Sequence, residues 1–142
     1  MTTDPKEGGK QASELRLRYA AQLLKMRLKL GLTQGQASLL VGVHRTYVNK
    51  VESGKVNLSL DNLDKFLEVY LNERGRVSSR ERLASNLKAW RGNTYSQEAL
   101  GLTFGIPRTS LSRIEQASAT TSLDQVAILA GKLGVDPTEL LK

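Results

Sequence analysis

The sequence predicts an all-α protein that consists of two similar units in tandem. The stretch QGQASLLVGVHRTYVNKVE at residues 34–52 recurs without a gap as QEALGLTFGIPRTSLSRIE at residues 97–115, an offset of 63 residues. In both copies the apolar residues recur at helical spacing on either side of a glycine, Gly42 or Gly105, which is the pattern of two short helices joined by a tight turn. The 142 residues of the chain suffice for two such units of roughly 60 residues each.

The first unit is expected to begin with a long helix. Residues 1–12 show no apolar period and are expected to form a flexible N-terminal arm. From Ser13 to Leu30 the apolar residues follow the i, i+4, i+7 spacing of one buried face, and Gly31 is expected to end the helix. The predicted buried positions are Leu15, Tyr19, Leu23, Met26 and Leu30. The basic residues on the other faces, most of them expected to be solvated, are Arg16, Arg18, Lys25, Arg27 and Lys29.

The repeated segment predicts the ends of its own helices. Thr33 is expected to cap the first helix of copy one, and Ser96 the corresponding helix of copy two. Four positions before each turn glycine stands a small residue, Ser38 or Gly101, which lets the two helices approach closely. The second helices of the two copies are expected at residues 44–52 and 107–115.

Further helices flank each copy, and a polar segment separates the units. In the first unit Ser59 is expected to cap a helix, and in the second Ser79 is expected to cap a helix that precedes the repeat. Helices at residues 123–133 and after Asp136 are expected to complete the second unit. Residues 72–78, NERGRVS, are polar, contain glycine and lack an apolar period. The expected boundaries are 1–12 for the arm, 13–74 for the first domain and 75–142 for the second.

This arrangement resembles the helix-turn-helix of the Cro/CI-type (XRE) bacterial and phage regulators. The residues that carry the resemblance in copy one are Thr33, Gln34, Gly42, Val43, Arg45, Val48, Val51 and Glu52. In copy two they are Ser96, Gln97, Leu100, Gly105, Ile106, Arg108, Leu111, Ser112, Arg113, Ile114 and Glu115. Two departures are Ala37, where the family usually has leucine, and Ala117, where a glycine usually follows the second helix. The resemblance implies two tandem lambda-repressor-like helix-turn-helix domains, each binding DNA through its second, recognition helix.

The outward residues of the recognition helices suit the reading of base edges. They are expected to be Arg45, Thr46, Asn49 and Lys50 in copy one, and Arg108, Thr109, Ser112 and Arg113 in copy two. Arginine or lysine can donate hydrogen bonds to guanine, asparagine can pair with adenine, and the threonine methyl group can contact thymine. Tyr47 and Ser110 occupy intermediate positions, near the DNA backbone or at the groove edge.

Other residues are candidates for contacts with phosphates. Gln34 and Gln97 stand at helix N-termini, where free N–H groups and the helix dipole favour an anion. In the family that the chain resembles, this glutamine usually touches the DNA backbone. His44, at the start of the recognition helix, and Lys55, in the loop after it, are further candidates in copy one.

The composition limits the chemistry of the protein. A net charge of +7 and an isoelectric point near 9.9 indicate a polyanionic partner. With no cysteine, one histidine and no recognisable pairing of a nucleophile with a base, neither a metal site, nor a cofactor, nor enzymatic activity is expected. No apolar run approaches the ~18–20 residues of a membrane span. No membrane partner is therefore expected, and the cytoplasm is the expected location.

Together these patterns predict a transcription regulator that binds double-stranded DNA sequence-specifically, a repressor that reads two half-sites with its two units. The alternative is a protein-interaction module, an antiactivator or antitoxin whose helical faces bind another regulatory protein, with one motif degenerate for DNA. The helices after each motif either pair two chains into a homodimer or hold the two halves of one chain together, and periodicity leaves this choice open.

Overall fold

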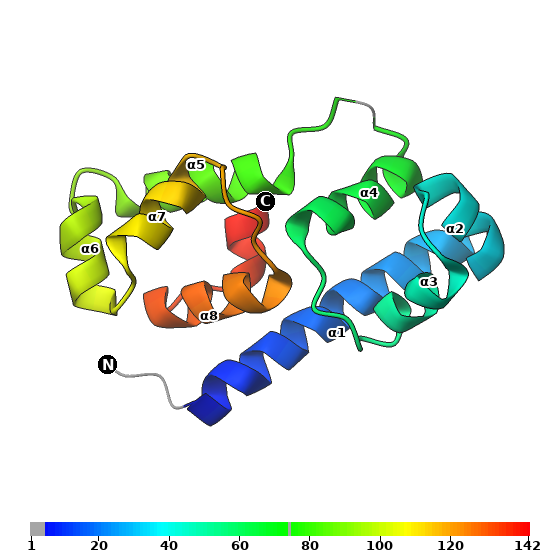
Figure 1. Cartoon of the computed structure of the whole chain (residues 1–142), viewed down its shortest axis with the longest axis horizontal. Coiled ribbons are helices and arrows are strands. Elements are labelled where there is room, and N and C mark those ends of the chain that lie inside the picture. The colour runs from blue at the N-terminus through cyan, green and yellow to red at the C-terminus, as the bar shows by residue number, and fades with distance from the viewer. Residues whose placement is uncertain (1–4, 74) are drawn as a thin grey trace.

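The protein is helical throughout its two units. The computed structural model describes residues 5–73 and 75–142, with side chains from Glu14 onward. The helices of the first unit are α1 (Pro5–Lys29), α2 (Gln34–Val41), α3 (Arg45–Glu52) and α4 (Leu60–Leu71). Those of the second are α5 (Ser79–Arg91), α6 (Gln97–Phe104), α7 (Arg108–Glu115), α8 (Leu123–Leu133) and the 3₁₀ helix η1 (Pro137–Leu141) (Figure 1). The predicted all-α class is confirmed, and none of the helices in the described ranges is both long and apolar enough to cross a membrane.

Each repeat folds around its turn glycine as predicted. Thr33 caps α2 in a full capping box, and Ser96 caps α6. Gly42 and Gly105 adopt φ angles of 82° and 68°, a left-handed conformation that glycine enters without strain. A Cβ atom on Gly101 would lie 2.4 Å from a carbonyl oxygen of the turn that follows α6, so this position tolerates only glycine.

The start of α1 was predicted incorrectly. The helix begins at Pro5 rather than Ser13, so that residues 5–12 of the expected arm are helical, and residues 1–4 lie outside the described residues. Proline suits the first turn of a helix, and extending a helix that already exists costs far less than nucleating one. The lack of apolar periodicity before Ser13 therefore did not mark the N-terminal end of α1.

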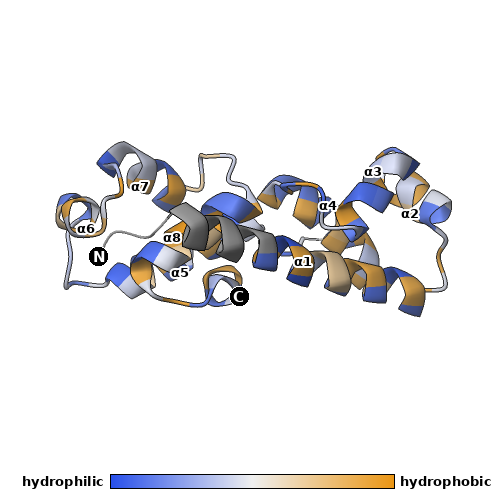
Figure 2. Ribbon diagram, turned by 90° about the horizontal axis from the view of Figure 1, so that it is seen from below, coloured by the Kyte–Doolittle hydropathy of each residue, from blue (hydrophilic) through white to orange (hydrophobic). Residues whose placement is uncertain are grey.

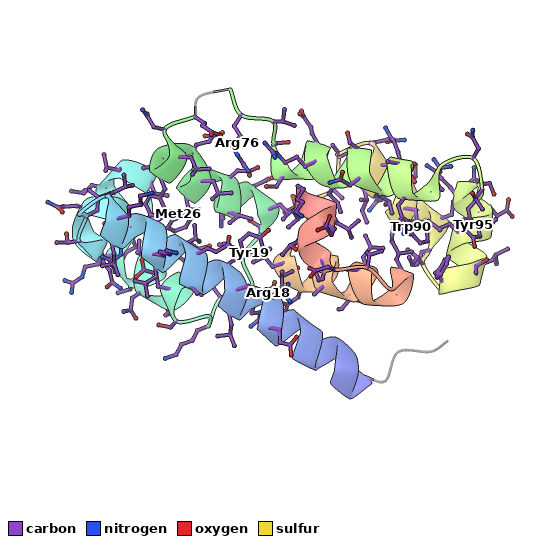
Figure 3. The ribbon with its side chains drawn as sticks, turned by 180° about the vertical axis from the view of Figure 1, so that it is seen from behind. Arg18, Tyr19, Met26, Arg76, Trp90 and Tyr95 are labelled. Carbon is purple, nitrogen blue, oxygen red and sulfur yellow. The ribbon has the colours of Figure 1, made fainter. Side chains whose placement is uncertain are left out.

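The buried stripe of α1 is shorter than predicted. Leu15 and Leu23 are 1% exposed, and Tyr19 and Met26 pack partly buried against the same core (Figure 3). Leu30, in contrast, is 49% exposed, because α1 ends one residue before it and the chain turns away.

The two units meet around a local two-fold axis. Ser59 and Ser122 occupy equivalent positions 63 residues apart and form an antiparallel bridge. The backbone N–H of the residue after each serine donates to the carbonyl oxygen of the residue before the other, both at 2.8 Å. An antiparallel pairing of a segment with its own repeat equivalent is what a two-fold relation requires.

Side chains repeat the same symmetry. Arg16 of α1 donates two hydrogen bonds to Asp124 at the start of α8, and Arg80 of α5 donates two to Asp61 at the start of α4. The two aspartates are equivalent at the offset of 63 residues, and the two arginines at an offset of 64, because the segment between Arg91 and Gln97 is one residue shorter than that between Arg27 and Gln34. Helix α8 accordingly packs on α1, and α4 packs on α5. Arg16 is thus an interface residue and not, as predicted, a solvated one, and the helices after the motifs join the halves of one chain.

The second residue after each recognition helix tests this backbone geometry. Gly54 and Ala117 are equivalent, and both adopt a positive φ, 70° and 54°. A side chain in this region costs about 1 kcal/mol. We expect Ala117→Gly to raise the free energy of unfolding by about 0.5–1 kcal/mol in urea titrations.

The reverse change serves as the matched control. A Cβ on Gly54 would lie 2.8 Å from Cδ2 of Leu17, so Gly54→Ala is expected to lower the free energy of unfolding by more than about 1 kcal/mol. If both substitutions changed stability in the same direction, the assigned backbone conformations would be wrong.

Candidate nucleic-acid interface

The two recognition helices, α3 and α7, are anchored by apolar residues on their inner faces. Val48 and Val51 of α3 and Leu111 of α7 are buried, and Ile114 packs partly buried against the core. In Figure 2 the helices lie along the same edge of the molecule, one toward each end. One side of the protein therefore carries both recognition helices.

The predicted base-reading residues occupy the outer faces of these helices. Those that are exposed are Arg45, Thr46, Asn49, Lys50, Arg108, Thr109 and Arg113. Ser112 is half-buried. Because core residues take the inner positions, helical geometry leaves these side chains facing outward. Their contacts with bases remain a prediction.

Among the described side chains, no carboxylate neutralises the positive charge of this surface. No salt bridge in residues 14–73 and 75–142 involves the cations of the candidate interface, namely Arg45, Lys50, Lys55, Arg108 and Arg113. Arginines elsewhere, such as Arg16 and Arg80, bind carboxylates. The five cations of the candidate interface therefore give this surface a positive charge that suits a polyanion.

The glutamines at the helix starts are tied to the recognition helices. Gln34 Nε2 donates to Glu52 Oε1 at 3.1 Å, and Gln97 Nε2 donates to Glu115 Oε1 at 3.3 Å. In the first unit, Asn49 Nδ2 also donates to Gln34 Oε1 at 3.5 Å. Each amide nitrogen carries a second N–H, and the first backbone N–H groups of α2 and α6 have no partner within their helix. Both glutamines are thus fixed in orientation with a donor available for a phosphate.

A buried ion pair beneath each recognition helix was missed by the sequence analysis. Arg27 donates to Glu52 at 2.6 and 2.9 Å, and Arg91 donates to Glu115 at 3.0 and 2.6 Å. The hydrogen bonds to Glu52 raise the pKa of Arg27 above its ordinary value. The expectation that Arg27 is solvated is therefore wrong. The recurrence of the same arginine and glutamate in both copies was the signal that could have revealed these pairs.

The side chain of Tyr47 connects the recognition helix α3 with α4. Its ring stacks on Phe66 of α4, with ring centroids 6.3 Å apart. Its hydroxyl oxygen accepts a hydrogen bond from Asn62 Nδ2 at 3.0 Å. The side chain thus holds α3 against α4 and is half-buried, whereas its counterpart Ser110 on α7 is exposed.

His44 and Lys55 flank α3 at its two ends. His44 is the N-cap residue, as its Nδ1 accepts a hydrogen bond from the backbone N–H of Thr46 at 3.2 Å. With Nδ1 as the acceptor, the neutral ring carries its proton on Nε2, which can donate to a phosphate. Lys55 is exposed in the loop after α3, while the equivalent residue of the second unit is Ser118. The first unit therefore has one more candidate phosphate contact at this point.

Comparison with known proteins agrees with this geometry. A family model described as Helix-turn-helix matches the chain twice, at residues 23–70 and 87–140. Comparison with curated proteins and with solved structures found no match. Each matched segment contains both helices of one motif, including its recognition helix. DNA binding and transcription regulation are the functions of this family. The chain therefore belongs to the Cro/CI-type (XRE) family of helix-turn-helix regulators, and it carries two copies of the family's motif in tandem.

Proposed function

We propose that the protein is a repressor that binds double-stranded DNA sequence-specifically as a single chain and occludes a promoter. Each recognition helix reads one half-site. The observation that supports this proposal is the local two-fold relation through Ser59 and Ser122, which leaves both recognition helices on one side of the molecule.

The internal symmetry replaces a dimer. Helix-turn-helix dimers place two recognition helices on half-sites one helical turn, about 34 Å, apart. In this chain the contacts of α1 with α8 and of α4 with α5 hold two motifs together without a second chain. Because the two readers are covalently joined, binding of one raises the local concentration of the other at its half-site.

The two half-sites are expected to be related but unequal. Arg45 and Arg108 occupy equivalent positions early in the recognition helices, which favours a shared base contact. Asn49, however, corresponds to Ser112, whose shorter side chain cannot make the paired contact that asparagine makes with adenine. The operator is therefore expected to be an imperfect palindrome.

A second candidate function has one observation in its favour. Leu39 of α2 and Leu102 of α6 occupy equivalent positions and are 84% and 81% exposed. Large exposed apolar side chains that recur at matching sites can mark contacts with a protein. If the chain acts as an antiactivator or antitoxin, it should co-purify with another regulator and should not shift DNA fragments.

Substitutions on α2 and α3 test the proposed roles. Arg45→Ala and Lys50→Ala are each expected to weaken binding to the specific site by about 1–3 kcal/mol and to relax base preference. Gln34→Ala removes a candidate phosphate contact. It should therefore weaken binding to specific and to random DNA by more similar amounts than the α3 variants do. Electrophoretic mobility shifts with both kinds of DNA at several salt concentrations measure the difference. If all three variants lost the same affinity for specific and for random DNA, the assignment of base reading to Arg45 and Lys50 and of phosphate binding to Gln34 would be wrong.

A further inference from the structure

The second unit contains a cavity of about 360 Å³ beside its recognition helix. Its walls come from α7, from the loop between α7 and α8, and from α8. The volume lies within the range of roughly 300–1,000 Å³ in which small-molecule sites of proteins are found. The cavity is partly open to solvent.

Comparison of the repeats shows why space remains there. Ser110 and Leu129 line the cavity, and they are equivalent to Tyr47 and Phe66, whose rings stack on each other in the first unit. A third lining residue, Ala119, likewise replaces a larger valine. Truncation of side chains at fixed backbone geometry leaves a void. The second unit thus lacks the aromatic pair that joins α3 to α4 in the first.

The lining has a definite chemical character. Its apolar part includes Ile106, Ile114 and Ile128, which are the three isoleucines of the chain. Its charged part consists of Arg113 and Lys132, and the described lining residues include neither aspartate nor glutamate. Lys132 Nζ donates to a backbone carbonyl oxygen at 3.1 Å, which fixes its position between α8 and the turn before α7. A cavity lined by two cations, by no carboxylate and by apolar side chains suits an organic anion that has an apolar group.

We propose that this cavity is an effector site for a small organic carboxylate with an aromatic or branched apolar group. The apolar group occupies the volume that the rings of Tyr47 and Phe66 fill in the first unit, and the carboxylate binds Lys132 and Arg113. The regulatory consequence rests on the proposed function, because Arg113 is also a candidate DNA contact. A bound carboxylate competes with the DNA for this arginine, so occupancy weakens reading of the second half-site.

Methyl NMR of the full chain tests ligand binding without any DNA. Labelling the isoleucine δ1 methyl groups gives three signals, all from residues of the cavity wall. With 4-phenylbutyrate as the probe, we expect all three signals to shift saturably. The uncharged amide of the same compound should bind about tenfold more weakly, because it lacks the charge-assisted hydrogen bonds.

Variants that copy the first unit provide the controls. Ser110→Tyr with Leu129→Phe should fill the cavity and abolish the shifts, while Lys132→Val should weaken phenylbutyrate binding about tenfold and leave the folded spectrum intact. Ser112→Asn copies the first unit outside the lining and should bind the probe as the unaltered protein does.

Several outcomes would overturn the proposal. Unshifted isoleucine signals at millimolar phenylbutyrate, or equal shifts in the filled variant, would exclude a site in this cavity. Equal shifts with inorganic phosphate would instead identify a general anion contact, of the kind that a DNA phosphate makes. Since these measurements contain no DNA, they remain informative even if the protein fails to bind an operator.

Discussion

Replacing Glu52 by alanine is expected to lower the free energy of unfolding by about 3–5 kcal/mol, the usual effect of leaving a buried charge without its partner. The side chains of Glu52 and Arg27 are only 6% and 9% exposed, so water can replace little of the lost ion pair. Glu52 also accepts a hydrogen bond from the side-chain amide of Gln34, so the substitution removes a contact at the start of α2 as well. Urea unfolding followed by circular dichroism measures the change.

Two matched variants separate the charge effect from a general packing defect. The same change in the second unit, Glu115→Ala, should be less harmful, since Arg91 is 21% exposed and can reach water more easily. The double variant Arg27→Met, Glu52→Leu should recover most of the stability, because an apolar pair leaves no unpaired charge. A Glu52→Ala protein within about 0.5 kcal/mol of the original would contradict the buried pair.

Removing the two arginines of the second recognition helix is expected to weaken DNA binding strongly. Arg108→Ala combined with Arg113→Ala should weaken binding to the full operator by about 2–6 kcal/mol, if each arginine contributes about 1–3 kcal/mol. Hydroxyl-radical footprinting should then show protection lost over one half of the site and retained over the other. Fluorescence anisotropy with a labelled operator gives the affinity.

The equivalent variant of the first unit is the control for this experiment. Arg45→Ala with Lys50→Ala should remove protection from the opposite half of the same operator. An unchanged footprint and affinity in the Arg108, Arg113 variant would show that the second unit does not bind DNA and serves instead as a structural or partner-binding domain.

The motif itself could be predicted from sequence because its signals are local. Capping by Thr33 and Ser96, the left-handed turn glycines and the outward positions of the recognition helices depend on residues within a few positions of one another. The repeat strengthened these predictions, since the cap, the turn glycine and the recognition helix all occur twice in register.

The joining of the two units depends on contacts that no local pattern encodes. Arg16 and Asp124 are 108 residues apart, and nothing in the amphipathic pattern of α1 distinguishes this arginine from a solvated one. The partial burial of Tyr47 likewise depends on Phe66 of another helix. Once those partners are known, the difference between Tyr47 and Ser110 explains the cavity, which the sequence repeat alone could not reveal.

The most direct test of the account is the number of chains bound to one operator. Native mass spectrometry of the complex with a duplex that carries a single footprinted site gives this number, and hydroxyl-radical cleavage of the same complex maps the contacts. We predict one chain per duplex, with two protected regions about one helical turn apart on the same face of the DNA. Two chains per duplex, each protecting one region, would contradict the proposal that the internal two-fold arrangement replaces a dimer.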